Sequence, residues 1–205
     1  MNFLAHFHLA WPDRRLIAGG LEGDYHKGPL RGQLDPGIEQ GVWLHRAIDA
    51  YTDSHLIVDE LRRQFPRSLR RYAGILIDIS FDYYLTTYWS RYSNVPLGEF
   101  NASIYQALLE QEALLSADCL KMMKRIVDYD VLNRYHDWDA VIATAIRVGE
   151  RFRRGNPLQQ VQHELEPLRG HLEASFLAFY PELLSFSSIH RQQLKSENFM
   201  SDNAI

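Results

Sequence analysis

Helical periodicity recurs along nearly the whole chain, and it constrains the fold more than any other feature of the sequence. Between residues 36 and 65 the recurring apolar positions are Ile38, Val42, Ile48, Tyr51, Ile57, Val58 and Leu61. Intervals of three, four or their sums are typical of one face of a helix. No alternating apolar run flanks an Asn-Gly or Asp-Gly turn, so strand signals are scarce. The pattern predicts an all-α protein.

Capping residues, prolines and glycines divide this pattern into about seven to nine expected helices. Asp13, Asp35 and Asp137 are the expected N-caps, and Pro181 is an expected kink or boundary. The expected helices cover about residues 3–9, 13–25, 36–65 as one helix or two abutting ones, 68–91, 100–112, 118–129, 137–153 and 158–184. Since no linker or repeat interrupts them, we expect one domain over residues 1–187 and a polar tail over residues 188–205.

Composition excludes several classes of protein. The chain has 205 residues, enough for one sizeable core, and its net charge of −4 gives no argument for nucleic-acid binding. No run of about 18 uncharged apolar residues is present to span a membrane. The single cysteine, Cys119, lies in an apolar segment and cannot form a disulfide within the chain, so a packing role and a reducing compartment are favoured. The first ten residues lack the basic leader of a signal peptide. We expect a cytoplasmic protein that binds neither nucleic acid nor membrane.

Two aspartates stand inside an apolar helical segment. Asp78 and Asp82 are four residues apart in Ile77-Asp78-Ile79-Ser80-Phe81-Asp82, so both carboxylates share one helix face. Like charges on a buried face repel unless a cation or a proton lies between them. A divalent metal ion resolves this repulsion, and a buried ion pair with an arginine is the structural alternative.

A second stripe of polar residues follows the same logic. His45, Asp49 and Asp53 are spaced by four and line one side of a helix that also carries apolar residues. Arg46 is three residues before Asp49 and can pair with it. This stripe indicates a functional face, with a solvated helix face as the alternative.

Two further clusters lie nearer the start of the chain. Asp24 and Lys27 stand between glycines at an expected helix end, where the carboxylate can approach a metal ion and the lysine a phosphate. An exposed helix terminus explains them equally well. His6 and His8 are two residues apart, so they point about 200° apart on a helix and at most one of them faces a given site directly.

The sequence lacks the motifs of several other catalytic mechanisms. The sequence has no Gly-x-Ser-x-Gly elbow, no phosphate-binding Walker loop, no Cys-x-x-Cys and no His-Glu-x-x-His. His136-Asp137 has the form of a metal-binding dyad, but Asp137 stands where a helix cap is needed.

These clusters, taken in order and spacing, resemble the acyl carrier protein phosphodiesterase family. The resemblance is carried by residues 1–10 (Met-Asn-Phe-Leu-Ala-His-Phe-His-Leu-Ala), 23–28 (Gly-Asp-Tyr-His-Lys-Gly), 44–49 (Leu-His-Arg-Ala-Ile-Asp), 52–53 (Thr-Asp) and 78–82 (Asp-Ile-Ser-Phe-Asp), and more weakly by 176–181. It implies an all-helical fold distantly akin to the histidine–aspartate metal phosphohydrolases. It implies hydrolysis, with a divalent metal that is typically manganese, of the phosphodiester joining 4′-phosphopantetheine to a serine of acyl carrier protein.

From this resemblance and the clusters follows an expected site. We expect Mn²⁺ or Mg²⁺ to be held by Asp24, Asp78 and Asp82 with His6 or His8, because oxygen-rich ligation suits these ions. The residues expected to act on the substrate are His45 as acid, Asp49 or Asp53 as base, and Arg46 and Lys27 as phosphate contacts. One residue departs from the family pattern: Tyr83 follows Asp82 where the family tends to have histidine.

The substrate implied by the resemblance is an acidic protein, so a basic docking face is expected. Residues 62–71 contain Arg62, Arg63, Arg67, Arg70 and Arg71. They could steer an acidic partner, or they could form a solvated basic corner. Two other functions remain open from sequence alone, a phosphohydrolase of nucleotides or other small phosphate esters and a non-catalytic module that binds carrier protein.

Overall fold

The computed structural model describes the backbone of residues 1–152 and 155–202, with side chains as far as Leu194, and this part of the chain contains helices but no strand. The all-α prediction is confirmed. The α-helices are α1 (Phe3–Ala10), α2 (Arg14–Glu22), α3 (Pro36–Ser54), α4 (Leu56–Gln64), α5 (Ala73–Thr87), α6 (Leu97–Glu110), α7 (Ala117–Asp128), α8 (Trp138–Gly149), α9 (Val161–Leu165) and α10 (Arg169–Asp202). The 3₁₀ turns are η1 (Arg70–Tyr72), η2 (Trp89–Arg91), η3 (Glu112–Leu114), η4 (Leu132–Arg134), η5 (Pro157–Gln160) and η6 (Glu166–Leu168).

The expected caps start three of these helices. The Asp13 side chain accepts hydrogen bonds from two backbone N–H groups at the start of α2, and Asp35 does the same for α3. Asp137 accepts one from the backbone of Asp139 at the start of α8. These bonds satisfy N–H groups that have no partner within the helix, so the three capping predictions are confirmed.

The backbones of α2 and α3 touch along a pair of glycines. A Cβ added at Gly19 would lie 2.2 Å from the carbonyl oxygen of Ile38, and one at Gly41 would lie 2.6 Å from the Cα of Gly19. No other residue leaves room for this approach. It lays the end of α2 beside the middle of α3, so that Asp24 and His45 become neighbours.

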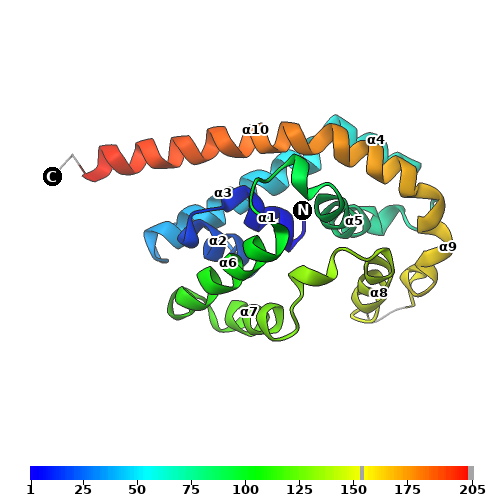
Figure 1. Cartoon of the computed structure of the whole chain (residues 1–205), viewed down its shortest axis with the longest axis horizontal. Helices are drawn as coiled ribbons and strands as arrows, with labels where there is room; N and C mark the ends of the chain where they lie inside the picture. Colours follow the sequence, from blue (N-terminus) through cyan, green and yellow to red (C-terminus); the bar gives the residue numbers. More distant parts are fainter. Residues whose placement is uncertain (153–154, 203–205) are drawn as a thin grey trace.

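The last helix crosses most of the molecule, packing against α3, α4 and α5 (Figure 1). The expected end near residue 184 is wrong, because α10 continues through Pro181 to Asp202. Two polar side chains bind this extension to the end of α1: the Ser187 hydroxyl donates to the Leu9 carbonyl oxygen, and the Arg191 guanidinium donates to the carbonyl oxygens of Leu9 and Trp11.

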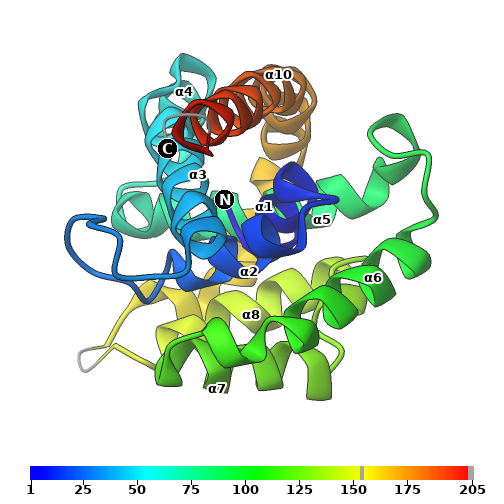
Figure 2. The same ribbon diagram turned by 90° about the vertical axis from the view of Figure 1, so that its left-hand side faces the viewer.

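Helices α6, α7 and α8 form a layer beneath α1 and α2 (Figure 2). Helix α6 packs on α2, and α8 packs on α5. The helix expected over residues 137–153 ends at Gly149, and residue 153 lies outside the described part of the chain. None of the described helices combines the length and the apolar character needed to cross a membrane.

Candidate metal and phosphodiester site

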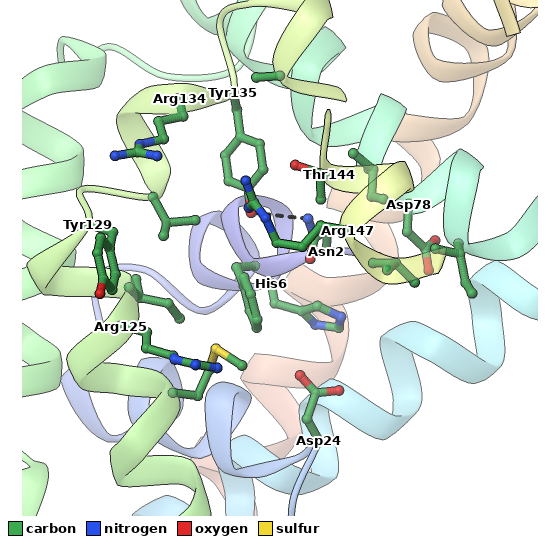
Figure 3. Close-up of a pocket in the computed structure, with 18 of the residues that line it drawn as sticks. Asn2, His6, Asp24, Asp78, Arg125, Tyr129, Arg134, Tyr135, Thr144 and Arg147 are labelled. Atoms are coloured by element: carbon green, nitrogen blue, oxygen red, sulfur yellow. Dashed lines mark hydrogen bonds between the residues drawn. The ribbon is translucent and has the colours of Figure 1, made fainter. Parts of the chain in front are cut away.

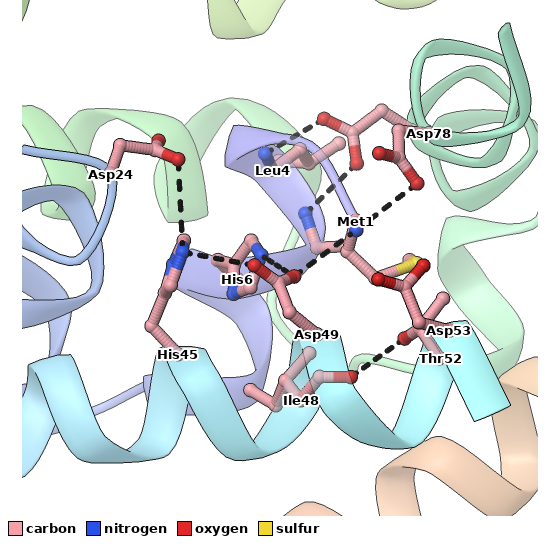
Figure 4. Close-up of polar contacts among 12 residues, drawn as sticks. Met1, Leu4, His6, Asp24, His45, Ile48, Asp49, Thr52, Asp53 and Asp78 are labelled. Carbon is pink, nitrogen blue, oxygen red and sulfur yellow. Dashed lines mark hydrogen bonds and ion pairs between the residues drawn. The ribbon is translucent and has the colours of Figure 1, made fainter. Parts of the chain in front are cut away.

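Two histidines and an aspartate meet where α1 crosses α3. The Asp49 carboxylate places Oδ1 3.2 Å from His6 Nε2 and Oδ2 3.1 Å from His45 Nε2 (Figure 4). His45 and Asp49 are neighbours because they are one helical turn apart, whereas His6 arrives from α1. The imidazole rings of His6 and His45 stack with their centroids 4.1 Å apart, and both side chains are buried.

Two more carboxylates border this cluster. Asp24 Oδ1 lies 3.7 Å from His45 Nε2. Asp78 Oδ1 lies 3.1 Å from the amino nitrogen of Met1, which is itself 3.4 Å from Asp49 Oδ1 (Figure 4). A positive charge therefore already lies between Asp49 and Asp78, which shows that these carboxylates form an attractive environment for a cation.

A glycine permits the contact between Asp24 and His45. A Cβ at Gly23 would lie 2.5 Å from His45 Cγ, well inside van der Waals contact. The preceding helix can therefore end directly against the imidazole ring only with glycine at this position. The loop that follows is held from α3, because the Arg46 guanidinium donates to the carbonyl oxygens of Gly28 and His26.

The protonation states suit a ligand set. Burial, followed by repulsion from His45, lowers the pKa of His6 to about 3, so its imidazole is neutral near pH 7 and has a free lone pair. Burial alone would raise the pKa of Asp49, but hydrogen bonds to His45 and His6 and the charge of the Met1 amino group hold it well below its usual value. Burial raises the pKa of both Asp24 and Asp78.

A divalent cation fits the donor atoms that are present. His6, His45 and Asp49 each offer one nitrogen or oxygen, and these atoms all lie within 4.8 Å of one another. His6 Nδ1 and His45 Nδ1 have no hydrogen-bond partner in the described part of the chain, and His6 Nε2 contacts the Asp49 carboxylate. Buried polar atoms are rarely left unpaired, so imidazoles beside a carboxylate in this state match the ligands of a transition-metal ion.

The cluster forms part of the wall of a large cleft. The cleft has a volume of about 1110 Å³ and lies between α1, α2 and α5 on one side and α7, η4 and α8 on the other (Figure 3). His6, Asp24 and Asp78 are among the residues that line it, so the buried cluster borders this cleft. The remaining walls carry apolar residues and several arginines.

Three of the residues expected at the site, Asp82, His8 and Asp53, lie outside the cluster. Asp82 is fully buried and accepts hydrogen bonds from the backbone N–H groups of Leu4 and Ala5, so it caps the start of α1. Burial, partly offset by these bonds, raises its pKa to about 7. The two carboxylates have different partners in the structure, since Asp78 contacts the Met1 amino group and Asp82 accepts from the backbone of α1.

His8 points to the opposite side of α1. Its Nδ1 lies 2.8 Å from the Tyr180 hydroxyl oxygen, and its ring packs edge-on against Trp89 and Phe100. Of the two histidines, the structure brings His6 alone to the cluster.

Asp53 and the two basic residues make local contacts. Asp53 pairs with Arg62, and Lys27 Nζ donates to the carbonyl oxygen of Asp24 at 2.6 Å. Arg46 does not pair with Asp49, because it binds the backbone of the loop after α2. Lys27 and Arg46 therefore position Asp24 and its loop.

The position that departs from the family pattern lies away from the cluster. Tyr83 packs edge-on against Trp138, and its hydroxyl accepts a 3.4 Å hydrogen bond from Arg169. The dyad of His136 and Asp137 is likewise distant in role, since Asp137 caps α8 and His136 bonds the Asn133 carbonyl oxygen.

Sequence reasoning did not identify Met1, Gly23 or the arginines of the cleft. Gly23 was visible as part of the glycine-bracketed motif, but its contact with His45 depends on how closely α2 approaches α3. The arginines come from α7, η4 and α8, where no motif marks them.

Comparison with known proteins identifies the family of the chain. The family model for acyl carrier protein phosphodiesterase matches residues 1–183. A relative called acyl carrier protein phosphodiesterase in Escherichia coli O6:H1 is 31% identical over 193 residues, covering 92% of this chain and 98% of the relative. Relatives with the same name in Salmonella agona and Klebsiella pneumoniae are 30% and 29% identical, each over 90% of this chain and 96% of the relative. No solved structure matches the chain, so its likeness to the histidine–aspartate phosphohydrolases stays a prediction. The chain belongs to the acyl carrier protein phosphodiesterase family.

Proposed function

We propose that this protein hydrolyses the phosphodiester between 4′-phosphopantetheine and the serine of holo-acyl carrier protein, releasing the apo-protein. The observation that carries the proposal is the cluster of His6, His45 and Asp49 beside a cleft of about 1110 Å³, in a chain of this family. The cluster supplies ligands for a metal ion, and the cleft gives a long prosthetic arm access to it.

The proposed cofactor is Mn²⁺, with Mg²⁺ as the alternative. His6, His45 and Asp49 would hold the ion, with Asp24 and Asp78 beside them. Two imidazoles favour manganese over magnesium, which prefers oxygen donors. When bound, such an ion polarises a phosphoryl oxygen and lowers the pKa of a water molecule.

The protein's own groups move the protons. Asp24 and Asp78 line the cleft, and burial raises the pKa of both carboxyl groups, a direction that suits groups that accept and donate protons. One of them accepts the proton of the attacking water. The other donates a proton to the serine oxygen, which is a poor leaving group without it. Lys27 and Arg46 hold the loop that carries Asp24 in position.

Replacing Asp78 tests the proposal directly. In Asp78→Ala we expect weaker manganese binding and loss of turnover, measured by metal titration and by intact-mass analysis of holo-acyl carrier protein. The matched control is Asp128→Ala, an exposed aspartate on α7 that lies outside the cleft lining. Normal manganese binding together with normal turnover in Asp78→Ala would exclude this site.

The size of the cleft favours a long substrate over a small phosphate ester. Pockets of about 300–1,000 Å³ already enclose drug-sized ligands, and this cleft is larger. Assaying nucleotides and holo-acyl carrier protein side by side separates the two activities. A protein that binds carrier but contains no metal and cleaves neither substrate would be a binding module instead.

We also propose that the arginines of residues 62–71 steer the acidic partner from a distance. Arg62 and Arg63 are paired with Asp53 and Asp59. Within the described part of the chain, Arg67, Arg70 and Arg71 are exposed and form no ion pair, so their charges are available to an approaching protein. Steering predicts an association rate that falls as salt rises, because salt screens exposed charges.

A further inference from the structure

Four arginines stand on the wall of the cleft opposite the metal cluster. Arg125 comes from α7, Arg134 from η4 and Arg147 from α8, and Arg151 lies two residues after the end of α8. We call them the arginine rim. All four are exposed cleft-lining side chains, and Figure 3 shows Arg125, Arg134 and Arg147 around the space in front of His6.

The charge of the arginine rim is not balanced by its own chain. Among the described side chains, none of the four forms an ion pair or a hydrogen bond, whereas Arg14, Arg62, Arg63 and Arg169 elsewhere are each paired with an acid. The acids that line the same cleft are Asp24 and Asp78, beside the cluster, and Glu150. The rim side of the cleft therefore carries four arginines and one acid, Glu150, and a concave wall with such an excess of positive charge attracts an anionic ligand.

The number of arginines indicates what kind of anion fits. A phosphodiester carries one negative charge, which a single arginine can pair with through two hydrogen bonds. Four arginines, spread over two helices and a turn, instead match several carboxylates spread over a surface. An acidic face of a protein has this chemistry.

The space between the rim and the cluster limits how far such a protein can enter. Met122 and Ile126 of α7 line the cleft on the rim side, and Phe7 and Ile79 line it on the opposite side. Apolar walls favour a slender, uncharged chain over a charged protein surface. Because the phosphodiester joins the arm directly to the partner's serine, that serine must reach the cluster while the acidic face of the partner lies against the rim and the arm lies along these apolar walls.

We infer that the arginine rim is the contact surface for an acidic protein that presents the phosphodiester on its serine to the His6 cluster while the attached arm lies in the apolar cleft. This inference rests on the proposed function and adds to it the face on which the protein substrate sits. It assigns close contact to α7, η4 and α8, and leaves long-range steering to the arginines of residues 62–71.

Charge reversal at the rim tests the inference. For Arg125→Glu/Arg147→Glu we expect the KM for holo-acyl carrier protein to rise about tenfold or more, with a smaller change in kcat and a flatter salt dependence. Arg125→Lys/Arg147→Lys should restore most of the affinity. The matched control is Lys121→Glu/Lys124→Glu, which makes the same change in net charge at two exposed positions of α7 outside the cleft lining.

Binding is measured separately from hydrolysis. Anisotropy titration of labelled holo-acyl carrier protein in the presence of a metal chelator reports contact at the rim alone. The inference is overturned if Arg125→Glu/Arg147→Glu binds carrier protein no more weakly than the control Lys121→Glu/Lys124→Glu, whether or not the variant hydrolyses it. If wild-type protein binds carrier through the rim but never cleaves it, the proposed function fails and the inferred surface stands.

Folding of the variants is followed by thermal unfolding. Should the double reversal lower the melting temperature strongly, Arg125→Ala and Arg147→Ala replace it, with an expected rise of about threefold each in the dissociation constant. Unchanged dissociation constants in both alanine variants would also overturn the inference.

Discussion

The two sides of α1 place the same side chain in opposite surroundings. On one side His6 faces His45, Asp49 and a cleft, with Nε2 beside the Asp49 carboxylate and Nδ1 without a hydrogen-bond partner among the described residues. On the other side His8 bonds the Tyr180 hydroxyl inside a group of aromatic rings. An imidazole bonded to a phenol among apolar neighbours is a structural residue, whereas a neutral one beside a carboxylate and a second imidazole is available for a metal ion.

The difference teaches that the neighbours, rather than the residue type, decide the chemistry. Both histidines belong to an eight-residue helix and both have a lowered pKa, for which burial is the main cause. What separates them is which helices cover each face: α3 brings a carboxylate to His6, and α10 brings a phenol to His8. A metal ion would be bound on the first side and excluded from the second.

The largest expected effect comes from replacing the two histidines one at a time. His6→Ala should lower manganese affinity and turnover by more than about a hundredfold, because even the loss of an outer partner of a metal ligand costs about 10–100-fold. His8→Ala should lower stability and leave manganese affinity within about twofold of wild type. Metal titration and turnover of holo-acyl carrier protein measure both.

The control for folding is urea unfolding of each variant at pH 7. Equal losses of manganese affinity in His6→Ala and His8→Ala would remove the distinction between the two sides of α1. So would a His6→Ala protein that binds manganese normally.

A second substitution disturbs the His6 side without removing any donor atom. In Gly23→Ala the new methyl group would lie 2.5 Å from the His45 ring, so the ring must leave its present position beside Asp49. We expect manganese affinity to fall about tenfold or more. Gly20→Ala in α2 is the matched control, because a Cβ at Gly20 would have no neighbouring atom within 4 Å. Equal affinities in the two variants would show that the His45 position does not matter.

Features that depend on residues close together in the sequence could be predicted. The caps Asp13, Asp35 and Asp137 were predictable because a cap depends on residues two or three positions away. The stripe of His45 and Asp49 was predictable for the same reason, since the two residues are one turn apart.

What could not be predicted depends on contacts between distant segments. Asp82 shares a helix face with Asp78, yet it caps a helix that begins 79 residues earlier, and spacing within its own segment cannot reveal that partner. Tertiary packing likewise decides which of His6 and His8 contacts Asp49 and whether the arginine rim lines the cleft. The extension of α10 to Asp202 depends on hydrogen bonds to the end of α1.

A third prediction concerns how the free energy of unfolding depends on pH through His8. Burial is the first cause that lowers the pKa of His8 to about 4, from 6.5 in the unfolded chain. Between these values the unfolded chain binds more protons, so the free energy of unfolding rises with pH from about 4 to 6.5 and falls when the protein is acidified. Through His8, wild-type protein should lose about 2 kcal/mol of its free energy of unfolding between pH 7 and pH 5. In His8→Gln this part of the loss should be absent. Urea unfolding at both pH values measures this, and equal losses in the two proteins would contradict it.

The smallest expected effect isolates the hydrogen bond that satisfies His8. Tyr180 is fully buried, and its hydroxyl bonds His8 Nδ1, so Tyr180→Phe leaves one buried imidazole nitrogen without a partner. We expect the free energy of unfolding at pH 7 to fall by about 1–2 kcal/mol, with manganese affinity unchanged. Because phenylalanine preserves the ring packing against Phe176 and Tyr92, a loss above this range would have to come from something other than the hydroxyl. A change in manganese affinity would mean that the two sides of α1 are coupled through the helix, and His8 would then belong to the site it faces away from.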